Sequence, residues 1–226
     1  MVDICGDSGS AKTELMMNVV ANYLTFYEDD AKIAYFDNDV KLDVTRLGVL
    51  LESRLSSSSS ISSSRRTDSN RTVTDLLRRV IVFRCRNQIE FMASLFSLDA
   101  RIQSGEIKLV MIDSWTAFLW DSVANRSAST SIGSQMCSWF RTYVQKYQLI
   151  VFGTTSSSRK LYLKFWNRIR SCRLHLRRVK TDAILSSRLL AKKPPNHEFE
   201  AGWSECSVRS GYVAKFRVVE SGLIEV

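Results

Sequence analysis

The sequence predicts an α/β fold built on a mostly parallel β-sheet with helices on both faces. Short, continuous apolar runs such as 33–36 and 109–112 alternate with longer stretches in which apolar residues recur at helical spacing. A run that is apolar throughout is typical of a strand buried on both faces, as the strands of parallel sheets are. At 226 residues the chain has room for one such domain, 1–226, and hardly for two.

Each expected element follows from these patterns. The first strand ends at Cys5, and apolar residues at helical spacing predict a helix from Thr13 to about Glu28. The other expected elements are strands at 32–36, 80–83, 109–113 and 149–152, helices at 43–55, 89–102 and 132–147, and a β-hairpin within 212–226. The serine-rich stretch 56–72 predicts a surface loop without a core.

The strongest motif lies at residues 6–13, between the first strand and the first helix. It reads Gly-Asp-Ser-Gly-Ser-Ala-Lys-Thr and matches the phosphate-loop pattern G-x-x-x-x-G-K-[ST], except at the second glycine. The backbone N–H groups of such a turn and the positive end of the next helix attract phosphate. We expect the cofactor-binding residues Gly6, Asp7, Ser8, Gly9, Ser10, Ala11, Lys12 and Thr13. The alternative is an ordinary Gly/Ser turn before a helix.

Three polar side chains end predicted strands at the same edge of the sheet as this loop. They are Asp39, Asp113 and Thr155, and ligands of parallel sheets bind at that edge. Asp113 beside the Thr13 hydroxyl would hold Mg²⁺, unless it only caps its strand. Asp39 is the candidate catalytic residue, which would orient a water or accept its proton, unless it only terminates a strand.

The positive charge of the chain is concentrated in a basic insertion at 156–195. It holds twelve of the 32 basic residues and a single acid, whereas the rest of the chain carries 20 basic and 22 acidic residues. Apolar residues from Leu161 to Val179 predict an amphipathic helix, and Tyr162 and Trp166 add surfaces on which bases stack. We expect this insertion to contact DNA. The alternatives are an anionic membrane surface, an acidic partner, or a solvated insertion or translated non-coding sequence without function.

Several classes of protein are disfavoured by composition. No apolar run reaches the roughly 18 residues of a membrane span. The five cysteines lie far apart without a C-x-x-C pair, which argues against a zinc site or a disulfide framework and suits a reducing compartment. The loop begins almost at Met1, so we also expect a chain that lacks an N-terminal lead-in.

Taken together, the motifs resemble the RecA/RadA recombinase family, and within it the small recombinase paralogues of homologous-recombination repair. The resemblance covers about 2–155 and 212–226. It is carried by 6–13, 36–39 with Arg46-Leu47, 109–114 and 152–155, and the paralogue branch is indicated by Lys12-Thr13-Glu14, 112–114 with 117–120, and Glu220-Ser221-Gly222. The resemblance implies a RecA-like P-loop NTPase core with a C-terminal β-hairpin.

The same resemblance implies a function. Lys12 and Thr13 would bind ATP and Mg²⁺, Asp113 would be the magnesium carboxylate, and Asp39 stands where active recombinases have a catalytic glutamate. Such paralogues are nuclear proteins of double-strand break repair. They join other paralogues and help the main recombinase on single-stranded or branched DNA, with no membrane involved.

Departures from the family pattern bear on activity. Ala11 replaces a glycine, Asp39 shortens the catalytic arm, and Thr154-Thr155 replaces an Asn-Gln pair that senses the γ-phosphate. They predict ATP binding with weak or absent hydrolysis. Two other functions stay open: an active P-loop ATPase or phosphotransferase, and an interaction module with a degenerate nucleotide site.

Overall fold

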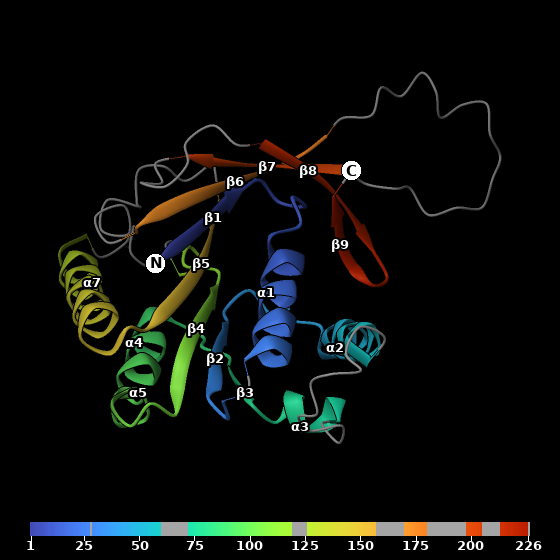
Figure 1. Ribbon diagram of the computed structural model, residues 1–226. Coiled ribbons are helices and arrows are strands. Elements are labelled where there is room, and N and C mark those ends of the chain that lie inside the picture. The colour runs from blue at the N-terminus through green and yellow to red at the C-terminus, as the bar shows by residue number, and fades with distance from the viewer. Residues whose placement is uncertain are drawn as a thin grey trace.

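The computed structural model describes residues 1–27, 29–59, 72–118, 126–156, 170–179, 198–204 and 213–225. These residues form a nine-stranded sheet with helices on both faces (Figure 1). The strand order is β3-β2-β4-β5-β1-β6-β7-β8-β9. The expected α/β class, with a mostly parallel sheet and a RecA-like core, is confirmed.

The strands of the parallel part begin at one edge of the sheet and end at the other. They are β1 (Val2–Gly6), β2 (Lys32–Asp37), β3 (Val80–Phe83), β4 (Ile107–Asp113), β5 (Ile150–Ser156) and β6 (Cys172–Arg178). Each neighbouring pair among them is parallel. The carboxyl ends of β1, β2, β4 and β5 therefore share one edge, and the segments that follow them meet there.

Beyond β6 the sheet continues in three antiparallel strands. They are β7 (Glu198–Ser204), β8 (Val213–Val219) and β9 (Gly222–Glu225). The hairpin of β8 and β9 turns at Glu220 and Ser221, so the expected C-terminal hairpin is confirmed. Figure 1 shows that the sheet curves at this end and brings β9 beside helix α1.

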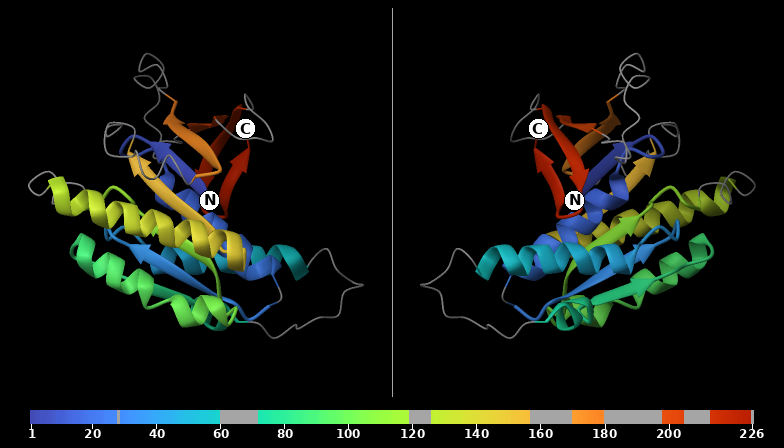
Figure 2. Two further views of the ribbon diagram at one scale, coloured as in Figure 1. Left: turned by 90° about the vertical axis from the view of Figure 1, so that its left-hand side faces the viewer. Right: turned by 90° about the vertical axis from the view of Figure 1, so that its right-hand side faces the viewer.

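The helices form a layer on each face of the sheet (Figure 2). One layer holds α1 (Lys12–Phe26), α2 (Val44–Ser59) and α3 (Val73–Leu77), and the other holds α4 (Gln88–Phe96), α5 (Asp99–Gln103) and α7 (Arg126–Tyr147). In β2, Ile33 and Tyr35 pack in the first layer, and Ala34 and Phe36 pack in the second. Burial on both faces explains why the strands are apolar throughout. None of the helices in the described ranges is long and apolar enough to cross a bilayer.

Some expected elements were wrong in extent or in kind. Residues 56–59, expected in the serine-rich loop, extend α2, while 60–71 lie outside the described residues. The helix expected at 89–102 is two short helices, α4 and α5. The helix expected from Leu161 to Val179 is contradicted where the structure describes it, because Cys172–Arg178 form β6. Buried Leu174 and Leu176 alternate there with exposed His175 and Arg177, and the strand pairs with β1.

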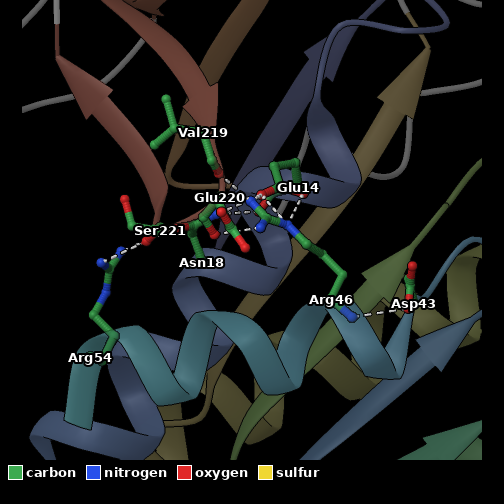
Figure 3. Close-up of polar contacts among 8 residues, drawn as sticks. All are labelled: Glu14, Asn18, Asp43, Arg46, Arg54, Val219, Glu220 and Ser221. Carbon is green, nitrogen blue, oxygen red and sulfur yellow. Dashed lines mark hydrogen bonds and ion pairs between the residues drawn. The ribbon is translucent and has the colours of Figure 1, made fainter. Parts of the chain in front are cut away.

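An arginine of α2 fastens the C-terminal hairpin to α1 (Figure 3). The Nη2 atom of Arg46 donates to Glu14 Oε1 at 2.5 Å and to the Val219 carbonyl at 2.6 Å, and its Nη1 atom donates to the Glu220 carbonyl at 2.5 Å. Glu14, Arg46 and Glu220 come from three separate motifs of the family resemblance. The structure therefore brings these three motifs into one polar network around Arg46, and Glu14 of that network directly follows Thr13.

A second arginine of α2 contacts the turn of the same hairpin (Figure 3). Arg54 donates to the Ser221 carbonyl and to Asn18 Oδ1, each at 3.2 Å. Gly222 lies against Asn18 and Arg54. A Cβ atom at this position would stand 2.6 Å from Asn18 Oδ1 and 3.0 Å from Arg54 Nη2. Its φ of +124° is also a conformation that favours glycine. The glycine therefore lets the turn approach α1 and α2 closely.

Candidate functional site

The loop at 6–13 leaves β1 at the carboxyl edge of the sheet and leads into α1. Gly9 and Ala11 both adopt left-handed backbone conformations, with φ of 76° and 63°. Ala11 thus takes a conformation that suits the glycine of the pattern, at a steric cost. A Cβ atom on Gly6 would lie 2.4 Å from Ser10 Oγ and 2.5 Å from the Leu176 carbonyl oxygen. Gly6 is therefore required by the packing of the loop.

The start of α1 presents donors to this loop. The N-cap residue of α1, Ala11, makes no side-chain hydrogen bond to the first N–H groups of the helix. These N–H groups form the positive end of the helix dipole. The Lys12 ammonium donates to the carbonyls of Gly6 at 2.8 Å and Asp7 at 2.7 Å. Within the described part of the chain, the buried Ser10 hydroxyl has no hydrogen-bond partner. This set of donors fits the phosphate groups of a nucleotide.

The electrostatic surroundings of Lys12 are unusual for a lysine. Burial lowers the pKa of Lys12, and the positive charge of Lys41 lowers the pKa further. An anion between these two side chains would oppose both effects, because it favours the charged form of each amine. The electrostatics therefore match the donor set of the loop.

Asp113 ends β4 and is held at both carboxylate oxygens. Thr13 Oγ1 donates to Oδ2 and Thr154 Oγ1 donates to Oδ1, each at 2.6 Å. The carboxylate is buried at the edge where the loop lies. Thr13 and Asp113, the two residues expected to bind magnesium, are thus in direct contact. Hydroxyl and carboxylate oxygens are ligands that Mg²⁺ prefers, so these residues fit that ion.

Asp39 follows β2 and is tied to the same strand end. The N–H groups of Asn38 and Asp39 donate to the Asp113 carbonyl at 2.7 and 3.2 Å. The Asp39 carboxylate forms an ion pair of 3.0 Å with Lys41. Asp39 therefore lies where sequence reasoning expected it, but its charge is opposed by an ammonium group two residues away.

These segments surround a cavity of about 250 Å³. It is lined by Ser8, Lys12, Asp39, Lys41, Ser114, Thr116, Ala117, Thr155 and Ser156. Asp39 and Thr155 thus line the same cavity as residues of the phosphate loop. Asp113 is not among these lining residues and contacts Thr13 instead. Sequence reasoning missed Lys41, Ser114, Thr116 and Ser156 as lining residues. Their signal was their position, within a few residues of the ends of β2, β4 and β5.

A buried carboxylate supports the back of this cavity. Thr155 Oγ1 donates to Asp3 Oδ1 at 2.7 Å, and Arg173 Nε donates to Asp3 Oδ2 at 2.5 Å. Asp3 is fully buried in β1. Sequence reasoning gave Asp3 no role, and the signal that could have found it was a carboxylate inside an otherwise apolar strand.

No protein-family model matches the chain. Mouse (Mus musculus) DNA repair protein XRCC2 is 26% identical over 163 residues, which cover 67% of this chain and 54% of the relative. The chain is therefore similar in sequence to a DNA repair protein of the XRCC2 type. It spans about half the length of the curated relative it matches.

The similarity to XRCC2 agrees with the architecture. The wider family resemblance was carried by residues 6–13, 36–39, 109–114 and 152–155, and these four segments contain or adjoin the carboxyl ends of β1, β2, β4 and β5. The hairpin motif Glu220-Ser221-Gly222 lies apart from them and contacts α2 instead. The motifs of the paralogue resemblance therefore serve two purposes, a candidate nucleotide site and the attachment of the hairpin.

Proposed function

We propose that this chain is a DNA repair protein of homologous recombination, a nuclear recombinase paralogue that binds ATP and DNA. In this role it assists the main recombinase in double-strand break repair. The similarity to a DNA repair protein of the mouse supports the repair role. The observation that carries nucleotide binding is the contact of Thr13 with Asp113 at the end of the phosphate loop.

In this proposal the residues of the cavity divide the work of holding the nucleotide. The backbone of 6–13 and the Lys12 ammonium bind the phosphates, and Thr13 and Asp113 hold Mg²⁺. Mg²⁺ held there would neutralise part of the phosphate charge. Lys12 would then leave the carbonyls of Gly6 and Asp7, which it contacts in the described structure.

The same residues support weak or absent hydrolysis. Asp39, the proposed catalytic residue, has a side chain one methylene shorter than the glutamate of active recombinases, so its carboxylate reaches less far toward an attacking water. Thr155 is bound to Asp3, which restrains the hydroxyl at the position expected to sense the γ-phosphate. Ala11 adds a strained residue to the loop. ATP would therefore act mainly as a bound ligand.

DNA and protein partners complete the proposal. The insertion 156–195 carries the excess positive charge of the chain, and phosphate contacts of Lys and Arg dominate affinity for nucleic acid. Its segments 157–169 and 180–195 lie outside the described residues, while β6 lies within them. The ligand we propose for it is single-stranded or branched DNA, and the partners are other recombinase paralogues and the main recombinase.

Thermal unfolding with ATP and Mg²⁺ tests the nucleotide site. We expect millimolar Mg-ATP to raise the melting temperature by about 5 °C, since a ligand that binds only the folded state stabilises it. Lys12→Ala should abolish this shift, and Lys32→Ala should keep it because Lys32 pairs with Glu106 at the opposite end of β2. A wild-type chain without any shift would instead favour the interaction module with a degenerate site. Steady ATP turnover that is lost in Lys12→Ala would favour an active ATPase.

Binding to labelled oligonucleotides tests the DNA part separately. We expect fluorescence anisotropy to rise with single-stranded or branched DNA at low salt and to fall back as salt releases the contacts. A chain that binds neither DNA at low salt, alone and with a paralogue partner, would contradict this part of the proposal.

A further inference from the structure

We propose that Lys41 is a second phosphate-binding cation of the cavity and contacts the terminal phosphate of a nucleoside triphosphate. This inference rests on the proposed function and deepens it, because it names the residue that would distinguish ATP from ADP. The pattern G-x-x-x-x-G-K-[ST] does not include Lys41, which lies 28 residues beyond its threonine in the segment between β2 and α2.

The position of Lys41 brings a second ammonium group to the same cavity as Lys12. Both residues line it, Lys12 from the start of α1 after the phosphate loop and Lys41 from the segment after β2. Lys12 contacts neutral carbonyl oxygens, and Lys41 pairs with Asp39. Two cations facing one cavity favour an anion of high charge, and the terminal phosphate carries more negative charge than the inner ones.

The existing partner of Lys41 is weakly held. The side chains of Lys41 and Asp39 are 54% and 27% exposed, and an ion pair in contact with water contributes little to stability. The Lys41 ammonium can therefore exchange Asp39 for a phosphate at low cost. Such an exchange also places the phosphate next to the carboxylate that stands at the catalytic position.

The backbone that carries Lys41 is preset for this position. The buried Asp37 carboxylate accepts hydrogen bonds from the N–H groups of Lys41 at 2.7 Å and Leu42 at 3.1 Å. Between Asp39 and Lys41, Val40 has a left-handed φ of 53°, which is a strained conformation for a β-branched residue. Strained backbone of this kind concentrates at ligand sites, where surrounding bonds hold it in place. Asp39 and Lys41, the residues on either side of Val40, both line the cavity.

The positions of β1, β4 and β2 in the sheet explain why a triphosphate, and not a diphosphate, would reach Lys41. In the sheet, β4 lies between β2 and β1, and the N–H groups of Asn38 and Asp39 donate to the Asp113 carbonyl, so the segment after β2 lies farther from β1 than the end of β4 does. Phosphates held by the loop nearest β1 would therefore be followed by a terminal phosphate near Lys41. A diphosphate, one group shorter, would contact the loop and Lys12 but not Lys41.

Titration of the full chain with fluorescent mant-ATP and mant-ADP in the presence of Mg²⁺ tests the inference. We expect Lys41→Gln to weaken mant-ATP binding about ten-fold and to leave mant-ADP binding within about two-fold of wild type. Lys41→Arg should retain most of the preference for mant-ATP because it keeps the charge. The matched control is Lys32→Gln, which removes a lysine from an ion pair of the same 3.0 Å length at the other end of β2.

The outcomes separate this inference from the proposed function. A wild-type chain that binds neither nucleotide overturns the proposed nucleotide site, and the inference with it. A chain that binds both and loses both in Lys12→Ala supports the site. In that case, equal mant-ATP affinities of Lys41→Gln and Lys32→Gln overturn the inference alone. Equal losses of mant-ATP and mant-ADP in Lys41→Gln would also overturn it, because the residue would then contact no terminal phosphate.

Discussion

The hydroxyl of Thr155 donates a hydrogen bond of 2.7 Å to Asp3, and this bond joins the wall of the cavity to the centre of the sheet. The other oxygen of Asp3 accepts from Arg173 at 2.5 Å, so one carboxylate connects β5, β1 and β6. A fully buried carboxylate is tolerated only when its charge is paired and hydrogen-bonded. The position of β6 and the orientation of Thr155 therefore depend on the same group.

Substitution of Asp3 by Asn should destabilise the fold strongly. The amide keeps the size of the side chain but removes the charge that Arg173 faces, and the Arg173 side chain is only 14% exposed. We expect a loss of about 3 kcal/mol in the free energy of unfolding, measured by urea denaturation. Lys32→Gln, at an exposed ion pair, should change the midpoint little. Similar midpoints for the two variants would contradict the buried pair.

Substitution of Ala11 by Gly should stabilise the chain. The left-handed conformation of Ala11 costs about 1 kcal/mol relative to glycine, and the substitution removes that cost. Because glycine also gains freedom in the unfolded state, the net gain in the free energy of unfolding should lie near 0.5 kcal/mol. Ala21→Gly, in the middle of α1, should instead destabilise by about 1 kcal/mol. A loss of stability in Ala11→Gly would show that the loop does not hold this conformation in solution.

Substitution of Asp113 by Asn should remove the dependence of nucleotide affinity on magnesium. The carboxylate supplies the negative charge that faces Thr13, and the neutral amide of Asn is a much weaker ligand for magnesium. We expect Mg²⁺ to strengthen mant-ATP binding of the wild type about ten-fold over EDTA and to leave Asp113→Asn unchanged. Asp43→Asn, at an exposed helix cap, should behave as the wild type does. A strong magnesium effect in Asp113→Asn would contradict the assignment.

Substitution of Gly222 by Ala should loosen the hairpin from α1 and α2. The new Cβ atom would meet Asn18 Oδ1 at 2.6 Å in a backbone conformation that already disfavours side chains. We expect a loss of about 2–3 kcal/mol in the free energy of unfolding. Gly105→Ala is the matched control, since Gly105 has a φ of +77° but nothing within 4 Å of the new atom. It should cost only about 1 kcal/mol, and equal losses would show that the close approach is not stabilising.

Substitution of Tyr35 by Phe should change how stability depends on pH. Burial raises the pKa of Tyr35 well above 10.0, and the charges of Asp113 and Asp37 raise this pKa further. The folded state therefore keeps the phenol neutral, whereas the unfolded chain ionises it near pH 10, so its stabilising contribution is lost as the pH rises above that value. We expect the wild type to lose more stability than Tyr35→Phe between about pH 9 and pH 11. Parallel melting curves over this range would contradict the effect.

At neutral pH the same variant should be as stable as the wild type or slightly more stable. The buried Tyr35 hydroxyl has no hydrogen-bond partner among the side chains and backbone that the structure describes. Its removal by Phe therefore breaks no described bond, and we expect a gain of up to about 1 kcal/mol in urea denaturation. A clear loss would indicate a bond that the hydroxyl makes in solution.

Local patterns were sufficient for the strands that are buried on both faces. The runs that became β2 and β4 are apolar throughout, and this composition admits little besides a covered parallel strand. The strand at Cys172–Arg178 was not predicted, because Cys172, Leu176 and Val179 also fit helical spacing. Pairing with β1 decided in favour of a strand there, and local spacing carries no information on a partner 170 residues away.

The sequence by itself predicted the phosphate-loop pattern at 6–13, the strands β1 to β5 and the polar residues at their carboxyl ends. These depend on neighbours in the chain, where residue type and spacing act directly. Only the tertiary structure decided which of these polar groups touch: Thr13 with Asp113, Thr155 with Asp3, and Lys41 with both the cavity and Asp39. These contacts join residues brought together by the sheet register and by the backbone after β2. The pattern at 6–13 could therefore be recognised from its own residues, whereas the cavity beside it is formed by separate segments that only the fold brings together.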